Sequence, residues 1–447
     1  MEGIQILLKQ HIGAPCIPCV QAGQRVKKGT LVAVPQGLGA NIFSSVYGQV
    51  EAVEADRIRI LPDETQPEAY EPIPLPETAS PLELITYAGI VGMGGAGFPT
   101  GVKLNAKLKD GWVLVNAAEC EPGLEHNIRQ MEERGAKTLR GIRLCMEITG
   151  AKKAVIAIKR KHAKAIKHLA SLLEGEKNIS LHLLPDIYPM GEERAVVREC
   201  LGIELDTTQL PSAANAVVIN GETLLRIAEA VEDRKPSYSK NITVRGQLHG
   251  GNQAHVFMDV PVGVSVGSLI KAAGGIDTDH CPYGEIIMGG AFTGHSVEME
   301  EPVTKTTGGI LVTADFPNLH EAPIGLLVCA CGGSEERMRE LAEKMNGRVV
   351  SVCRCKQAIE NKPGAPLKCL RPGNCPGQVQ NNLQFKKDGC QYILIGNCSD
   401  CSNTVMASAP KMGLKVLHMT DHAMRAVGHP LYRRLKTSKQ VSQELPE

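Results

Sequence analysis

The stretch at residues 92–104 reads GMGGAGFPTGVKL. Its first six residues hold four glycines: Gly92, Gly94, Gly95 and Gly97. Glycines let the backbone approach a ligand closely and expose its N–H groups. Lys103 follows where a bound phosphate would need a positive charge, but no Gly-Lys-Ser/Thr ends the stretch, so it is not a Walker A loop. A ligand cradle and a simple tight turn are therefore both open from this stretch alone.

Strands and helices alternate after this loop. The predicted strands are WVLVNAAE (112–119), AVIAI (154–158), ISLHLLP (179–185) and AVVIN (216–220). The predicted helices span 126–149, 161–175, 190–201 and 221–234. Alternation at this spacing predicts right-handed βαβ units and a mostly parallel sheet.

The sequence divides into several units around this α/β domain, which we place at 82–238. Turns and β-branched residues in 1–66 predict a β barrel-sandwich similar to a lipoyl domain, without an attachment lysine at a hairpin tip. Five prolines mark a linker over 67–81. Residues 239–318 predict a small α+β module around one short helix. Residues 322–436 return to α/β alternation, and 437–447 form a polar tail. The fold class is therefore multidomain α/β.

Composition excludes several functions. Lys+Arg 49 against Asp+Glu 48 gives a net charge of +1, which favours neither nucleic acid nor an acidic membrane as a partner. No apolar run approaches the roughly 20 residues of a membrane span, and we expect a cytoplasmic protein. In a reducing compartment the 15 cysteines should be metal-binding, redox-active or buried.

Nine cysteines follow residue 328, and most of them end predicted strands. The strand ends carry Cys329 and Cys331, Cys353 and Cys355, Cys398 and Cys401, and, on a fourth strand, His418 and His422. Carboxyl ends of parallel strands lie on one edge of a sheet, where ligands bind. We expect the three thiol pairs to converge there, with Cys369 and Cys375 folding over them and Cys390 buried at the opposite edge.

The chemistry of these thiols has three alternatives. A helix beginning near Ser402 would lower the pKa of Cys398 and Cys401 and favour a dithiol relay. An iron–sulfur cluster or a zinc ion could instead be held by Cys329, Cys331, Cys369, Cys375, Cys398 and Cys401. Cys16 and Cys19 form another C-x-x-C, although strand alternation should place them on different faces. Cys120 is expected only to line the ligand site.

Three further motifs follow the glycine loop: VNAAECEPG (115–123), YPMGEERAV (188–196) and INGETL (219–224). In order and spacing the four motifs resemble the flavin- and NADH-binding subunit of respiratory complex I, and more closely the RnfC component of the Rnf electron-transport complex. QHIGAP (10–15), IMGG (287–290) and EPVTKTT (301–307) also resemble RnfC. The sequence departs from complex I at Met93, Ala118 and Arg194, where complex I has Arg, an acid and Thr.

The resemblance implies FMN as cofactor, NADH as electron donor, and an SLBB-like β-grasp module at 239–318. The FMN phosphate and ribityl chain would be held by Gly92, Gly94, Gly95, Gly97, Lys103, Asn116, Asn220 and Thr223. The nicotinamide face would be lined by Glu119, Glu121, Tyr188, Gly191 and Glu192, with Glu119 or Glu192 orienting the ring.

The resemblance also suggests an electron path. RnfC proteins normally continue into two C-x-x-C-x-x-C-x-x-x-C-P ferredoxin motifs, and this sequence contains neither. An RnfC-like body with a cysteine-rich α/β end looks like the PrdC family, the electron-transfer proteins associated with D-proline reductase. That implies hydride transfer from NADH through FMN to protein thiols, with Cys398 and Cys401 as the terminal dithiol and the pairs Cys329/Cys331 or Cys353/Cys355 as relays.

Two other functions stay open. One is a cobalamin reductase, which shares the flavin motifs but normally carries ferredoxin clusters. The other is a non-enzymatic adaptor with a relic flavin fold and structural zinc. The expected partners are NADH and an acceptor protein such as D-proline reductase, and self-association into a homo-oligomer is also open.

Overall fold

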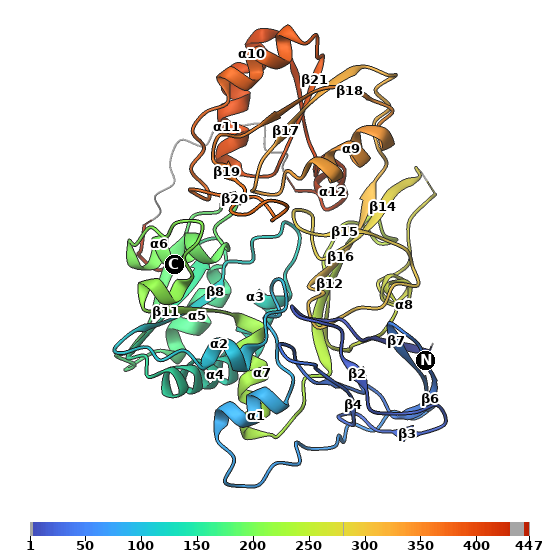
Figure 1. Ribbon diagram of the computed structural model, residues 1–447, viewed down its shortest axis with the longest axis vertical. Helices are drawn as coiled ribbons and strands as arrows, with labels where there is room; N and C mark the ends of the chain where they lie inside the picture. The colour runs from blue at the N-terminus through green and yellow to red at the C-terminus, as the bar shows by residue number, and fades with distance from the viewer. Residues whose placement is uncertain (1–2, 280, 430–441, 447) are drawn as a thin grey trace.

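The computed structural model describes residues 3–279, 281–429 and 442–446. The N-terminal part is a β-sandwich of two small sheets (Figure 1). One sheet has the order β1 (Ile4–Leu7), β7 (Arg57–Pro62), β6 (Gly48–Val53), β3 (Arg25–Val26), and the other β2 (Ile17–Pro18), β4 (Leu31–Val34), β5 (Ile42–Phe43). Buried and exposed residues alternate along β6, as expected for a strand with one face in the core. The predicted barrel-sandwich is thus confirmed.

The proline-rich segment that follows the β-sandwich contains no helix or strand between residues 63 and 80. Two backbone hydrogen bonds nevertheless fix its course, from Glu71 N–H to Lys28 C=O at 2.7 Å and from Ile73 N–H to Arg234 C=O at 2.8 Å. Its last proline, Pro81, begins α1 (Pro81–Tyr87), where the fixed φ of proline suits the first helical position.

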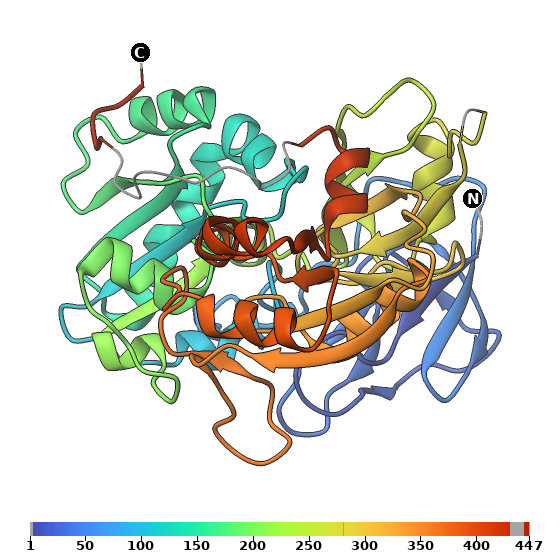
Figure 2. The same cartoon turned by 90° about the horizontal axis from the view of Figure 1, so that it is seen from above.

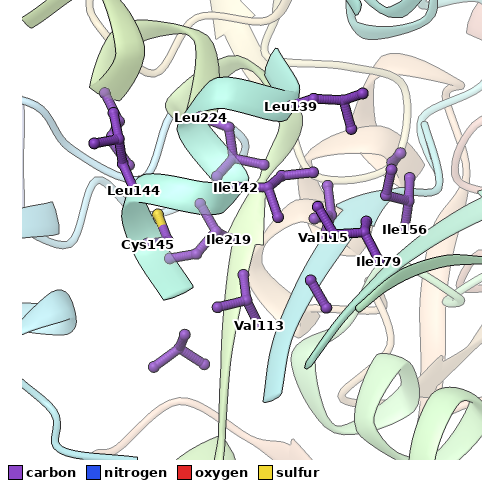
Figure 3. Packing of buried hydrophobic residues seen from close by; sticks show 14 of the residues in the cluster. Val113, Val115, Leu139, Ile142, Leu144, Cys145, Ile156, Ile179, Ile219 and Leu224 are labelled. Carbon is purple, nitrogen blue, oxygen red and sulfur yellow. The ribbon is translucent and has the colours of Figure 1, made fainter. Parts of the chain in front are cut away.

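The first α/β domain is built on a four-stranded, fully parallel sheet. Its order is β10 (Ile179–Leu184), β9 (Lys153–Lys159), β8 (Trp112–Ala117), β11 (Ala216–Asn220). The helices are α2 (Thr100–Leu104), α3 (His126–Glu133), α4 (Gly135–Thr149), α5 (Ala163–Leu172), α6 (Glu193–Leu201) and α7 (Gly221–Glu232). Figure 3 shows Leu139 and Ile142 of α4 and Leu224 of α7 packed against the strands, while α6 covers the other face. The predicted parallel sheet is confirmed.

The helix predicted over 126–149 is two helices. Arg134 leaves the helical region at φ −129°, ψ 27°, and separates α3 from α4. Its guanidinium reaches Asp259 at 2.7 Å, and a side chain on the following Gly135 would come within 3.0 Å of Leu172. Tertiary contacts, and not local helix propensity, therefore set this break.

The α+β module has the strand order β13 (His255–Pro261), β12 (Ser239–Gly246), β16 (Gly309–Ala314), β14 (Tyr283–Met288), β15 (His295–Val297), with one helix, α8 (Val266–Ala272). Only the β12–β16 pair is parallel among these neighbours. Strands around one short helix are what the sequence predicts.

The C-terminal α/β domain also has a parallel sheet, in the order β18 (Arg348–Arg354), β17 (Pro323–Val328), β21 (Tyr392–Ile395), β22 (Lys415–His418). Its other elements are β19 (Ala358–Ile359), β20 (Lys368–Cys369), α9 (Glu335–Lys344), α10 (Val379–Lys387), α11 (Ser399–Ser408) and α12 (Asp421–Ala426). Helix α11 begins at Ser399, three residues before the predicted start, because Cys398 takes the cap position.

The C-terminal domain lies over both the first α/β domain and the α+β module, as Figures 1 and 2 show. The predicted boundary at 436/437 lies outside the described residues. Part of the predicted tail is described. The Gln443 side chain accepts the backbone N–H of Leu183 and donates to its carbonyl, at the edge strand β10 of the first α/β domain. None of the helices in the described ranges is both long and apolar enough to cross a bilayer.

Candidate functional site

The glycine loop lies over the start of α7. Asn220 caps this helix, since its side-chain oxygen accepts the backbone N–H of Glu222 at 2.9 Å. Thr223, in the first turn, accepts the backbone N–H of Met93 through its hydroxyl at 3.1 Å. A Cβ on Gly94 would lie 2.4 Å from the Asn220 amide nitrogen, whereas one on Gly95 would meet nothing within 4 Å. The loop is therefore closely packed at Gly94 and open at Gly95.

Two asparagines meet at the carboxyl ends of neighbouring strands. Asn116 of β8 and Asn220 of β11 are direct partners in the parallel register. The predicted phosphate ligand Lys103 has its ammonium 2.6 Å from a Glu193 carboxylate oxygen and 3.0 Å from the Val218 carbonyl. The Asn220 amide and the open turn at Gly95 offer N–H groups to a phosphate-bearing polyol chain, so the site fits FMN. Lys103, Asn116 and Thr223 lie beside them and donate to protein oxygen atoms in this structure.

A buried ion network holds α7 in place beneath this site. Glu222 and Lys240 are both fully buried and form an ion pair. Glu222 also accepts a hydrogen bond from Arg226 at 3.1 Å and from the backbone N–H of Asn241 at 2.7 Å, and Arg226 continues to Asp259 at 2.7 Å. The helix that carries Asn220 is thus tied to strand β12 of the α+β module.

The opposite wall comes from the segment 188–192. The Asn116 amide donates to the Gly191 carbonyl at 2.8 Å, and the Gly191 N–H donates to the Cys120 sulfur at 2.8 Å. Glu192 caps α6 and accepts the backbone N–H groups of Arg194 and Ala195 at 2.9 and 3.0 Å. The structure therefore brings the motifs 115–123 and 188–196 together, as their predicted roles require.

The acidic loop 119–121 is closed by a loop of the α+β module. Glu121 accepts hydrogen bonds from the backbone N–H of Phe292 and the hydroxyl of Thr293, both at 2.6 Å. Burial raises the pKa of Glu121 to about 7. Glu119 instead accepts the backbone N–H of Asn127 at 3.1 Å. Phe292 and Thr293 are not among the site residues predicted from the sequence, although the Gly-rich run GGAFTG (289–294) around them was a usable signal.

Tyr188 joins three domains. Its ring packs edge-on against Phe292, with ring centroids 4.5 Å apart. Its backbone exchanges two hydrogen bonds with the C-terminal domain, one from its N–H to the Ser399 hydroxyl at 3.0 Å and one from the Ser399 N–H to its carbonyl at 3.2 Å. Burial and the nearby Glu121, Cys331, Cys120 and Cys398 side chains raise its pKa well above the usual value.

The C-terminal thiols converge beside Tyr188, as the strand ends predict. Cys329, Cys331, Cys355, Cys398 and Cys401 share one buried cluster with Tyr188 and Phe292. Cys353 packs against this cluster from its edge, where its thiol lies near Ser351, Asp388 and Cys390. Cys390 is buried, as predicted, and belongs to the same cluster. Both histidines are engaged elsewhere, His418 with Ser402 and His422 with Glu285, each at 2.7 Å.

The strongest interactions among the thiols form two sets, and Cys398 and Cys401 belong to different ones. The Cys331 thiol interacts with the sulfur atoms of Cys369 and Cys398, which lowers the pKa of both and raises that of Cys331. The Cys401 thiol interacts with Cys375 and lowers the pKa of Cys375 to about 6. Backbone N–H groups at the start of α11 also lower the pKa of Cys398, as predicted, whereas the pKa of Cys401 is raised.

The side chains that lie close enough together to share a metal ion are outside the thiol cluster. In the described part of the chain, His249, Asp277 and Asp279 place three potential ligand atoms within 4.8 Å of one another, and no thiols form such a group. The C-terminal thiols interact with one another, and a dithiol relay, an iron–sulfur cluster and a zinc ion are all compatible with them. Cys16 is buried against His11 at 3.2 Å, while Cys19 is exposed, so this C-x-x-C is split between two faces as predicted.

Comparisons with known proteins agree with this architecture. Residues 2–64 match the RnfC barrel sandwich hybrid domain, and residues 85–229 match the Nuo51 FMN-binding domain. A solved NAD⁺-reducing [NiFe]-hydrogenase shares 21% identity at a TM-score of 0.44, over 52% of this chain and 46% of that one.

Curated relatives cover more of the chain. Cobalamin reductase PduS of Citrobacter freundii is 38% identical over 78% of this chain and 72% of its own length. The PduS of Salmonella typhimurium is 40% identical over 52% of this chain, and the match spans about half (49%) of that relative. The C component of the Na⁺-translocating ferredoxin:NAD⁺ oxidoreductase complex of Acetobacterium woodii is 31% identical over 69% of this chain and 73% of its length. This chain is therefore a member of the RnfC-like family of oxidoreductases and carries that family's FMN-binding domain.

Proposed function

We propose that this protein is an NADH-oxidising electron-transfer flavoprotein that passes electrons through FMN to its C-terminal cysteines and on to an acceptor protein. The observation that carries the proposal is the contact between Tyr188 and Ser399. Through it, the first turn of α11, with Cys398, lies directly against the segment that would line the nicotinamide face. The thiols and the candidate flavin site therefore share one buried junction.

The residues that would hold the cofactor are those gathered at the strand ends. The phosphate and ribityl chain would be held by Gly92, Gly94, Gly95, Gly97, Lys103, Asn116, Asn220 and Thr223. The nicotinamide face would be lined by Glu119, Glu121, Tyr188, Gly191 and Glu192. Bound FMN would accept hydride and release electrons singly or in pairs.

The chain's own side chains orient the substrate and exclude water. Glu121 is fixed by two hydrogen bonds from the 292–293 backbone and hydroxyl, and Glu192 is fixed by the first turn of α6. Tyr188 and Phe292 pack together over the junction and exclude water between the candidate flavin site and the thiols of Cys331 and Cys398.

The acceptor is the finer part of the proposal, and we take it to be D-proline reductase. The sequence lacks the ferredoxin motifs through which electrons would leave one at a time, and it offers interacting thiols in their place. Thiols exchange electron pairs with a disulfide in the partner. Arg194, which replaces the Thr of complex I, donates to the Cys369 carbonyl at 2.9 Å and so attaches the thiol domain to the flavin domain.

A cobalamin reductase-like function is the second candidate, favoured by the 38% identity to PduS over most of the chain. A zinc-thiolate adaptor without electron transfer is the third. The three differ in their acceptor and in their metal content.

One anaerobic preparation of the full chain tests the proposal. NADH should bleach the flavin absorbance, increase the number of titratable thiols and drive proline reduction when D-proline reductase is added. Cys398→Ser should bleach normally but lose most of the thiol gain, while the control Cys281→Ser, at an exposed cysteine of the α+β module, should behave like the unmodified protein. A colourless protein with stoichiometric zinc would exclude electron transfer, and reduction of cobalamin without thiol gain would favour the second candidate.

A further inference from the structure

The C-terminal thiols face two different directions. Cys331, Cys369 and Cys398, here the inlet group, border the flavin domain: Cys331 and Cys398 are close enough to Tyr188 to raise its pKa, and the Cys369 carbonyl accepts the Arg194 guanidinium. Cys375 and Cys401, here the outlet pair, interact with each other and with residues of α10 and α11.

The outlet pair combines a reachable sulfur with a buried one. Cys375 is half-buried, in the Pro/Gly-rich loop before α10, while Cys401 is only 5% exposed. The adjoining turn of α10 reaches solvent, since Val379 is 51% exposed. A partner can therefore approach Cys375 but not Cys401.

Polar groups hold Cys375 in this position. Its sulfur lies 3.3 Å from the amide nitrogen of Gln378 and 3.2 Å from the hydroxyl of Thr404. Its backbone N–H donates to the Asp400 carboxylate at 2.6 Å, and Asp400 lies next to Cys401 in the chain. The Gln378 N–H donor stabilises the Cys375 thiolate, which is the form that attacks disulfides, while the Thr404 hydroxyl donates to the Cys401 carbonyl at 3.0 Å.

We propose, on the basis of the electron path above, that Cys375 is the residue that attacks a disulfide of the acceptor protein and that Cys401 resolves the product. The Cys375 thiolate bonds to one acceptor sulfur and displaces the other as a thiolate. Cys401, losing its proton, then attacks Cys375, which releases the second acceptor sulfur. The acceptor gains two electrons and two protons as a dithiol, and Cys375 and Cys401 become a disulfide.

Recharging uses the position of Cys398 beside Cys401. Cys398 attacks the Cys401 sulfur and frees Cys375 as a thiol, and Cys331 then attacks Cys398 and frees Cys401. The outlet pair is again a dithiol, and the disulfide now joins Cys331 and Cys398 in the inlet group, where the proposed oxidation of NADH restores the electron pair. The C-x-x-C motif thus transfers electrons from one set of thiols to the other.

Disulfide mapping tests the pairing without flavin or NADH. After oxidation of the reduced full chain with one equivalent of diamide, we expect a crosslink between the tryptic peptides 369–386 and 388–411, located by fragmentation at Cys375 and Cys401. A dominant Cys398–Cys401 disulfide within peptide 388–411 would overturn the assignment.

Turnover with an external disulfide tests the role. With NADH and the aryl disulfide DTNB, Cys375→Ser should lose at least tenfold in steady-state rate while flavin bleaching stays normal, and Cys401→Ser should trap the aryl mixed disulfide on Cys375. The control Cys281→Ser, which removes an exposed cysteine of the α+β module, should turn over normally. Full turnover by Cys375→Ser would refute the role. If NADH bleaches no flavin in the unmodified protein, the proposed function fails, and the mapping still decides the pairing.

Discussion

Replacing Lys240 by methionine should destabilise the first α/β domain by about 3 kcal/mol. Removing one partner of a buried ion pair typically costs about 3–5 kcal/mol, because the other charge stays buried. The lower end applies here, since Glu222 keeps its hydrogen bonds from Arg226 at 3.1 Å and from the Asn241 backbone at 2.7 Å. Methionine fills a similar volume, so the cavity contribution should be small.

Urea unfolding measures this loss through Trp112, the only tryptophan, which begins β8 in that domain. With a slope of about 2 kcal/mol per molar urea, the midpoint should fall by about 1.5 M. The matched control is Lys164→Met, which breaks an ion pair with Glu132 in which the lysine side chain is 79% exposed. That change should cost under about 1 kcal/mol. Equal midpoint shifts for the two variants would refute the reasoning that burial sets the energy of the Lys240–Glu222 pair.

Three further predictions concern the site. Gly94→Ala should lower the flavin content of the purified protein, because its methyl would lie 2.4 Å from a side-chain amide, whereas Gly95→Ala has open space and should bind flavin normally; equal absorbance spectra would contradict this. Because burial raises the pKa of Glu121 to about 7 above an ordinary value near 4.5, its protonated form stabilises the fold at low pH and this stability is lost as pH rises through 7. Relative to Glu121→Gln, the unmodified protein should lose about 3 kcal/mol between pH 4.5 and 8 by urea midpoints, and a constant difference would be inconsistent with the burial of this carboxyl. Alkylation of Cys375 should rise with pH around its pKa of about 6, and Cys353, whose pKa burial raises, should react slowly until higher pH; mass spectrometry after timed iodoacetamide quenches would detect the reverse order.

Local patterns were enough to predict the strands and their parallel arrangement. The apolar runs that end at Asn116 and Asn220 are buried strands, and the two asparagines meet at one sheet edge as expected. The convergence of the strand-end cysteines followed from the same rule. These features depend on periodicity and chain order, both of which a sequence displays.

The specific partners of these groups could not be predicted in this way. Lys103 is held by Glu193, ninety residues away in the chain, and the strongest thiol partners of Cys398 and Cys401 are Cys331 and Cys375. Such choices depend on how a helix is rotated and where a long loop crosses the sheet edge. Neither is encoded in the spacing of a motif.

Tyr188 has a consequence for the order in which the protein is made. Phe292 packs against the ring of this residue and Ser399 bonds its backbone, so segments synthesised at three separate times meet at one residue. Because domains generally fold as units from the N-terminus during synthesis, the last domain emerges when its docking surface is already formed. Nine of the 15 cysteines leave the ribosome in that last domain. The vectorial course of translation thus shortens the time in which these reactive thiols are without their burial partners.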